Sequence, residues 1–291
     1  MIDRTKIIQR ALTTALQIRQ RAKVPLTDAI CIFDFAEANG IDEVHFFSIP
    51  SLEEVYWKQA RKIIVSSLRP PGRQGFNCAH GFGHHVFGHG NCIAGVPSNE
   101  NGTRKLDPKE FLVDCFAGFL VMPRSTVSHG FVARGWQPRT CTPIQVYTVA
   151  GWLGVGYTTL IHHMSDVLNL ITRAHAESLL RVKPKQIRAE IMGRETPENV
   201  VVVDIVWTGR PVDIEVGDLV MLPRGATISG NCVDLVEENG SGLIIRGVAP
   251  GSGSRVTHAG TEWAAFLRVS KRGYHGRNLF RHREDPDYVN D

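Results

Sequence analysis

Residues 76–90 read FNCAHGFGHHVFGHG, and this stretch decides how the chain is interpreted. His80 and His84 are four residues apart, so on a helix their imidazoles point to the same side. Two imidazoles in that arrangement bind one zinc ion well. His85 and His89 have the same spacing, so spacing alone leaves the register of the pair undecided. An isolated pair of this kind is as often a set of solvated or hydrogen-bonded helix residues.

Glycines weaken the helix that this stretch predicts. Gly81, Gly83 and Gly88 each destabilise an isolated helix by roughly 1 kcal/mol relative to alanine. We therefore expect packing or a bound metal to hold the helix.

A second apolar stretch, KEFLVDCFAGFLVMP, follows at residues 109–123 and predicts a helix ended by Pro123. We expect this helix to lie beside the histidine helix. Together the two strings resemble the motifs of the ImmA/IrrE-type zinc metallopeptidases: AHGFGHHVFGHG resembles the HExxH helix, and EFLVDCFAGFLVMP resembles the second motif of that family. The resemblance spans about residues 5–180.

This resemblance implies a set of site residues. His80 and His84 are the metal-binding pair, Glu110 is the third zinc ligand, and water fills the fourth position. Asp114 occupies a position where the family has Asn or Asp, and it is expected to orient the metal ligands without binding the metal itself.

The chain departs from the family at the residue after the first histidine, where Gly81 replaces the glutamate of HExxH. That glutamate takes a proton from the zinc-bound water, and losing such a base reduces the rate about 10²- to 10⁴-fold. Three explanations stay open: a natural pseudo-enzyme, a sequence disabled on purpose, and a rescue by another group such as His85. The rescue is the least favoured, because His85 lies at a different level of the helix. We hypothesise that Gly81→Glu restores cleavage.

The family cleaves helix-turn-helix repressors and so switches on stress, mobile-element or phage-defence genes. The resemblance therefore implies a regulatory peptidase with a DNA-binding repressor as its substrate or ligand, here expected to be inactive because of Gly81. The alternative is a non-catalytic, zinc-stabilised protein-binding or sensor module.

The fold class that we expect is α+β. A zincin-like metallopeptidase domain is expected at residues 1–195, with a helix-turn-helix-like helical extension at about 140–195, and a small all-β regulatory or sensor domain at 196–291. The helix pair in TPIQVYTVAGWLGVGYTTLIHHM, residues 142–164, has almost no Lys or Arg to meet DNA phosphates, so we favour a scaffold role. Other expected helices are 5–22, 25–39 and 166–181, and residues 183–198 are expected to be a helix that tails into a linker. The expected strands of the first domain are 44–47 and 62–66.

Composition favours a cytoplasmic protein. The 291 residues are 43% hydrophobic and 21% charged, and the N-terminal residues have no uninterrupted apolar run that would serve as a signal or anchor. Six cysteines lie far apart without CxxC pairs, which favours reduced thiols. We expect no membrane partner.

Two further features are weaker. A thiolate reaching the open zinc position would close the site, and Cys232 and Cys92 are candidates for such a switch, although inert buried cysteines are the favoured interpretation. The C-terminal domain is a candidate for binding single-stranded nucleic acid or a small ligand, because residues 271–283 mix cations with aromatic rings. A packing or dimerisation module is at least as consistent with the sequence.

Overall fold

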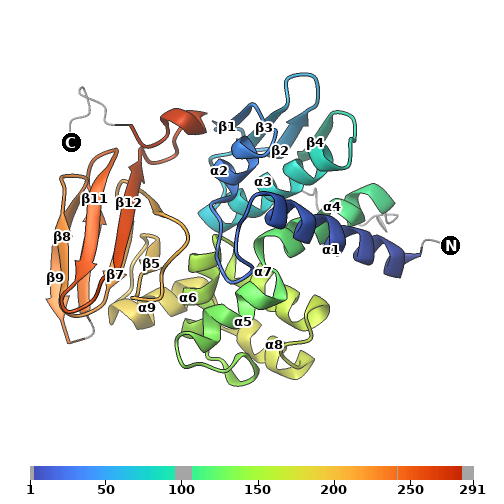
Figure 1. The fold of residues 1–291 in the computed structure, drawn as a ribbon. Coiled ribbons are helices and arrows are strands. Elements are labelled where there is room, and N and C mark those ends of the chain that lie inside the picture. The colour runs from blue at the N-terminus through green and yellow to red at the C-terminus, as the bar shows by residue number, and fades with distance from the viewer. Residues whose placement is uncertain (1–2, 96–106, 241, 284–291) are drawn as a thin grey trace. The chain divides into compact units, whose positions relative to one another are not determined.

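The structure is a computed structural model that describes residues 3–95, 107–240 and 242–283. The fold is α+β, with helices and three mixed sheets (Figure 1). The chain divides into two compact units. The first unit comprises residues 1–127, 153–156 and 275–278, and the second comprises 128–152, 157–274 and 279–291.

The first unit combines one five-stranded sheet with four helices among its described residues. Its elements are α1 (Arg4–Arg21), α2 (Ile32–Ala38), β1 (Glu43–Phe47), β2 (Leu52–Trp57), β3 (Lys62–Ser66), α3 (Pro71–Val86), β4 (Cys92–Gly95), α4 (Pro108–Val121) and β13 (Gly276–Arg277). The strand order is β13-β1-β3-β2-β4. β1 and β3 are parallel, and the other neighbours are antiparallel. The end of the chain thus contributes an edge strand to the N-terminal sheet.

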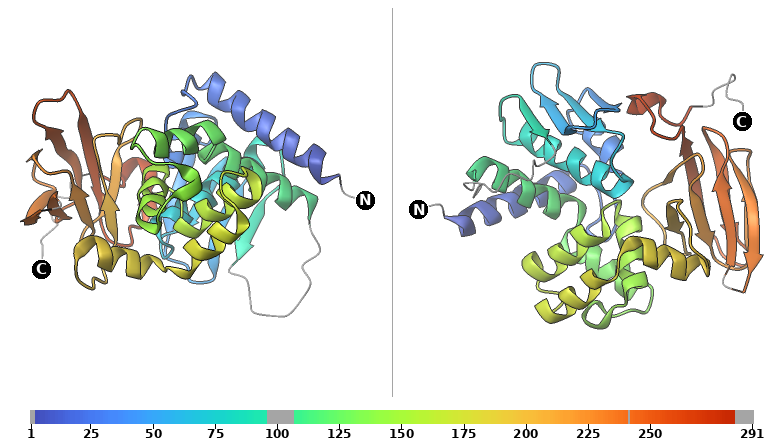
Figure 2. Two further views of the ribbon diagram at one scale, coloured as in Figure 1. Left: turned by 90° about the horizontal axis from the view of Figure 1, so that it is seen from below. Right: turned by 180° about the vertical axis from the view of Figure 1, so that it is seen from behind.

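Helix α3 is the centre of the first unit. It packs against β2 and β3 of the sheet and against α4, and α4 in turn packs against α1 (Figure 2). The fully buried Arg19 of α1 donates to the carbonyl oxygen of Leu120, at 2.9 Å, which fixes α1 on α4. The two motif helices therefore lie side by side, as the sequence predicted.

The second unit contains a helical part and a β-rich part. The helical elements are α5 (Arg124–Val132, of which the last five residues belong to this unit), a short 3-10 turn (Pro138–Thr140), α6 (Pro143–Leu153), α7 (Tyr157–His162), a π-helical turn (His163–Val167), α8 (Arg173–Arg181) and α9 (Pro184–Met192). The strands are β5 (Val200–Val202), β6 (Val212–Glu215), β7 (Leu219–Leu222), β8 (Ala226–Ser229), β9 (Val233–Asn239), β10 (Gly242–Gly247), β11 (Gly251–His258) and β12 (Ala264–Ser270), followed by a 3-10 turn (Asn278–Phe280). They form two four-stranded sheets, β5-β7-β10-β9 and β6-β12-β11-β8.

Polar contacts join the helical and β-rich parts of this unit. The Arg134 guanidinium binds both carboxylate oxygens of Asp204, at 2.6 and 3.0 Å. The buried Trp152 donates from its indole nitrogen to the Thr208 carbonyl oxygen at 3.1 Å. Most of residues 128–192 therefore belong to the same compact unit as the β-rich region. The predicted domain boundary between residues 195 and 196 stays a prediction, because it concerns which segments fold independently.

The sequence predicted most of the helices and missed some strands. The helix at 5–22 and the strands at 44–47 and 62–66 are confirmed. The helix expected at 25–39 begins only at Ile32, and β2 and β4 were not expected at all.

The helix expected at 166–181 is also wrong at its start. Asn169 adopts a left-handed backbone, with φ of 51°, which an α-helix does not accept. Helix α8 instead begins after Thr172, whose hydroxyl accepts from the His175 N–H.

One helical stretch among the described residues, Pro108–Val132, is long and apolar enough to cross a membrane. In its most apolar window, 67% of the stretch is buried inside the protein. The core helix of a globular protein passes the same test.

Candidate metal centre

Close packing explains why glycine-rich α3 is a helix. A Cβ on Gly72 would lie 2.4 Å from the carbonyl carbon of Val155, and a Cβ on Gly83 would lie 3.0 Å from the Cβ of Val113. Real side chains do not fit at the first of these distances, and the second is very tight. The glycines therefore let the helix approach its neighbours, and packing supplies what helix propensity lacks. The helix ends where Gly88 takes a left-handed conformation, with φ of 69°.

The structure brings His80, His84 and Glu110 together. The Nε2 atoms of His80 and His84 lie 3.1 Å apart. A carboxylate oxygen of Glu110, from the first turn of α4, lies 3.2 Å from the Nε2 of His80, and its other oxygen lies 3.7 Å from that of His84. His84 is 1% exposed, whereas the Glu110 side chain is 49% exposed, so the group opens to solvent on the α4 side.

These distances fit a bound metal ion. Atoms that bind one zinc ion tetrahedrally at about 2.0–2.1 Å lie about 3.3 Å from one another. Two imidazole nitrogens and one carboxylate oxygen are a donor set that zinc accepts, and this set leaves a fourth position for water. His80, His84 and Glu110 could therefore hold a metal with small movements of their side chains.

The charges around His80 also favour a cation. Burial alone would lower the pKa of His80, but the neighbouring carboxylates, Glu54 first, raise it to about 10. Burial and the charge of His80 lower the pKa of His84 to about 4. The hydrogen bond from His80 lowers the pKa of Glu110. Without a metal, a proton on His80 thus balances carboxylates that a metal ion would balance better.

Outer contacts orient both histidines. The Nδ1 of His80 lies 2.9 Å from a carboxylate oxygen of Asp114. The Nδ1 of His84 lies 3.0 Å from the Nδ1 of His89 and 3.1 Å from the Cys92 sulfur. Contacts at Nδ1 leave Nε2 free to bind a metal, which is how ligand histidines are usually held.

His85 turns away from this group. Its Nδ1 lies 3.0 Å from the Tyr56 hydroxyl, and its Nε2 lies 3.0 Å from the point where a Cβ on Gly40 would be. A rescue of catalysis by His85 therefore has no support in its contacts. The backbone at Gly81 is buried, and a side chain there would point toward Ile63 and Glu54.

The two candidate switch cysteines lie in different units. The Cys92 sulfur touches the Nδ1 of His84, on the far side of the ring from Nε2. Burial first, and then the charge of Glu110, raise the pKa of the Cys92 thiol, which opposes thiolate formation. Cys232 is 1% exposed within the second unit. The cysteine switch stays a prediction.

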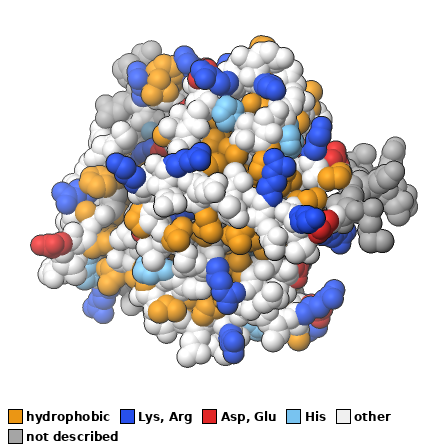
Figure 3. Space-filling view, turned by 45° about the vertical axis from the view of Figure 1, so that its right-hand side comes forward, with side chains coloured by type: hydrophobic (Ala, Val, Ile, Leu, Met, Phe, Trp, Pro, Cys, Tyr) orange, Lys and Arg blue, Asp and Glu red, His pale blue; other side chains and the backbone are white. Residues whose placement is uncertain are grey.

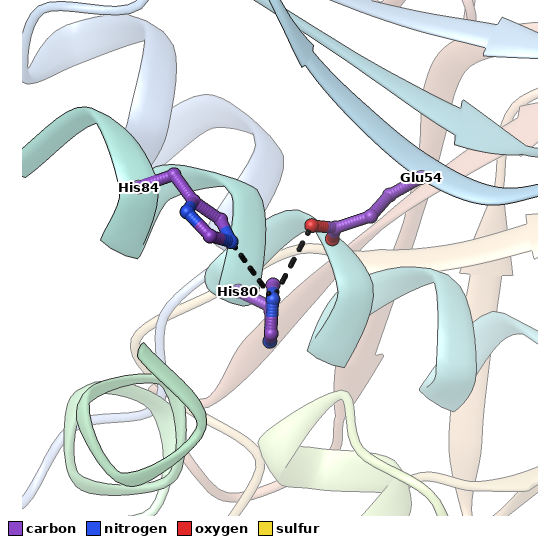
Figure 4. A group of neighbouring side chains, drawn as sticks. All are labelled: Glu54, His80 and His84. Atoms are coloured by element: carbon purple, nitrogen blue, oxygen red, sulfur yellow. Dashed lines mark hydrogen bonds and ion pairs between the residues drawn. The ribbon is translucent and has the colours of Figure 1, made fainter. Parts of the chain in front are cut away.

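Glu54 was not among the site residues predicted from the sequence. Its side chain is 3% exposed and extends from β2 toward α3, where one oxygen lies 3.7 Å from the Nε2 of His80 (Figure 4). Glu54, His80 and His84 also form a group whose ligand atoms all lie within 4.8 Å of one another. Burial above all raises the pKa of Glu54 to about 8. Alternation could have indicated it, because Glu54 and Tyr56, two residues apart on the strand, are both buried while Val55 between them is half-buried.

The basic C-terminal stretch is integrated into the fold. Arg277 forms an ion pair with Glu43 at 2.7 Å, and Arg281 is 4% exposed. On the face shown in Figure 3, the described Lys and Arg side chains are scattered among hydrophobic ones and form no single basic patch. Nucleic-acid binding there stays a prediction.

Comparison with known proteins gives one family. Residues 45–150 match a peptidase family described as the IrrE N-terminal-like domain. The match begins within β1, covers β2 to β4 and α3 to α5, and continues through most of α6. No curated protein sequence matches the chain. The match confirms the family resemblance of the two motifs for residues 45–150, and it leaves the β-rich part of the chain outside it.

Proposed function

Because residues 45–150 belong to the IrrE N-terminal-like domain family of peptidases, we propose that the protein is a zinc-dependent regulator of the zincin-like type that cleaves a helix-turn-helix repressor. The observation that carries this proposal is the convergence of His80, His84 and Glu110 at distances of 3.1 to 3.7 Å. A stress or phage-defence response in the cytoplasm is the proposed setting.

The residues of the site have separate tasks in this proposal. His80, His84 and Glu110 hold the ion, and Asp114 keeps the His80 ring turned by accepting from its Nδ1. A bound zinc ion would polarise the scissile carbonyl group and acidify water. The Glu110 side chain is 49% exposed, so solvent reaches the ligand group from the α4 side.

The alternative is a zinc-stabilised module that binds a repressor or another signal without cutting it. Gly81 is the observation that favours it, since no acid or base stands at that position of α3. In either form, the β-rich region is proposed to sense a small ligand or single-stranded nucleic acid, and the helix pair at 142–164 is proposed to be a scaffold.

Comparison of newly formed protein N-termini in cells tests the proposal. Cells that produce the wild type are compared with cells that produce His84→Ala, which lacks a buried ligand candidate. We expect new termini within a helix-turn-helix repressor only with the wild type. Capture of an intact repressor without new termini would favour the binding module, and neither capture nor cleavage would contradict both forms.

A further inference from the structure

The space next to Gly81 is filled by a carboxylate from another element. A Cβ on Gly81 would lie 3.6 Å from the Oε1 atom of Glu54 and 3.1 Å from a methyl carbon of Ile63. A side chain at this position would therefore start toward the place where the Glu54 carboxylate already lies. Glu54 comes from β2, 27 residues earlier in the chain.

Glu54 is held with one oxygen fixed and the other turned to the site. The N–H of Gly81 donates to its Oε2 at 3.2 Å. Its Oε1 lies 3.7 Å from the Nε2 of His80, the atom that also meets Glu110 (Figure 4). The α3 backbone thus positions the carboxylate that the α3 side chains lack.

The neighbouring Glu53 shows what a structural glutamate looks like on this strand. Its carboxylate accepts from Asn77 at 2.9 Å and forms ion pairs with Arg69 at 3.1 Å and Arg73 at 2.8 Å. Glu54 has no such arginines: among the described residues its ion pair is with His80. Burying a carboxylate without a permanent counter-ion is unfavourable, so a glutamate at this position is better explained by chemistry than by stability.

We propose that Glu54 replaces the missing HExxH glutamate as the proton acceptor of this site. The inference rests on the proposed peptidase function. Oε1 accepts a proton from the water whose oxygen attacks the carbonyl carbon, and the same proton then passes to the amine nitrogen as the carbon–nitrogen bond breaks. One water is consumed, and a carboxyl and an amine terminus form.

Glu54 fits a proton acceptor better than a metal ligand. Glu110 already reaches both histidines, at 3.2 and 3.7 Å, and completes a three-ligand set. The hydrogen bond from the Gly81 N–H holds Oε2 of Glu54 against the helix and restricts rotation of the carboxylate. The two roles give different results on substitution, because a lost ligand weakens zinc binding and a lost proton acceptor does not.

The test uses the 291-residue protein loaded with zinc, and acetohydroxamic acid, a small zinc-binding probe that transfers a proton to a nearby base when it binds. Glu54→Gln keeps the size and the acceptor for the Gly81 N–H but removes the charge. We expect its affinity for the probe to fall about tenfold or more, the usual effect of losing a charged hydrogen bond. Zinc content and zinc affinity should match the wild type.

Glu53→Gln is the matched control, because it makes the same change one residue away. It should lose stability, since the ion pairs of Glu53 with Arg69 and Arg73 are lost, yet bind the probe as the wild type does. Unchanged probe affinity in Glu54→Gln would overturn the proposal, and so would loss of zinc from it, which would make Glu54 a ligand.

A double variant guards against misfolding. Glu54→Ala with Gly81→Glu moves the carboxylate back onto α3, and it should bind the probe more tightly than Glu54→Ala alone. Equal affinity of these two variants would contradict the shared position of the two side chains. A wild type that takes up no zinc would instead overturn the proposed function, a result distinct from all of these.

Discussion

Glu54 in the first unit and Asp213 in the second are both buried carboxylates on strands, with side chains 3% and 7% exposed. Asp213 lies opposite Arg268 on the neighbouring strand, and the guanidinium binds both of its oxygens, at 2.6 and 2.9 Å. Burial alone would raise the pKa of Asp213, but the hydrogen bonds and charge of Arg268 hold it below its usual value. Glu54 receives one backbone N–H and faces a histidine, and burial raises its pKa to about 8.

The difference separates structural from functional buried charges. Asp213 is compensated by a side chain of the protein itself, so its ion pair holds two strands together. Glu54 lies beside the residues that could bind a metal, and among the described residues its ion pair is with His80, whose positive charge depends on a proton. Perturbed groups of the second kind mark a site, whereas compensated groups of the first kind mark a core.

The largest effect on stability is expected from Asp213→Asn. It removes the negative charge that faces the Arg268 guanidinium, which is 20% exposed, and breaking such a buried pair reduces the free energy of unfolding by about 3–5 kcal/mol. Urea unfolding at neutral pH measures the change. The exposed Asp234→Asn is the control and should change stability by about 0.5 kcal/mol or less. A loss in Asp213→Asn as small as in the control would mean that the pair is not structural.

A smaller loss is expected from Gly81→Glu. The new side chain starts 3.1 Å from Ile63 and brings a second carboxylate to Glu54, and overfilling a packed site reduces stability by about 1–3 kcal/mol. Thermal unfolding should show a smaller loss when Glu54→Ala is added. If Gly81→Glu is as stable as the wild type, its side chain does not compete with Glu54 for the space beside α3. The hypothesis that Gly81→Glu alone restores cleavage would then stand.

The smallest effect has the opposite sign. In metal-free protein, Glu54→Gln should raise the free energy of unfolding by about 1 kcal/mol at pH 7, because it removes a carboxyl that is unfavourable to ionise when buried. The pKa of Glu54 rises from its usual 4.5 to about 8 in the folded state. The wild type therefore loses stability as the pH rises from 4.5 toward 8, and the gap between variant and wild type should widen over that range. A gap that stays constant from pH 5 to pH 8 would contradict the raised pKa.

The sequence was sufficient for His80, His84 and Glu110 as candidates, because two linked motifs that resemble one family are local features; helical spacing alone left the histidine pair undecided. It was insufficient for Glu54, because β2 was not expected, and the position of Glu54 depends on how a strand packs against a helix 27 residues away. The helix pair at 142–164 was found from its own turn signals, with α6 and α7 as observed. The start of α8 was predicted wrongly because Asn169 has a left-handed backbone, which the hydrophobic periodicity of the sequence does not reveal.

The most direct test of the account is the metal content of purified protein, measured by mass spectrometry for the wild type, His80→Ala and His85→Ala. His85 is the matched control, because it belongs to the other pair with the same spacing and faces Tyr56. We expect about one zinc per chain in the wild type and in His85→Ala, and none in His80→Ala. The metal centre at His80, His84 and Glu110 would be contradicted if His85→Ala lost the zinc while His80→Ala kept it, or if the wild type bound none.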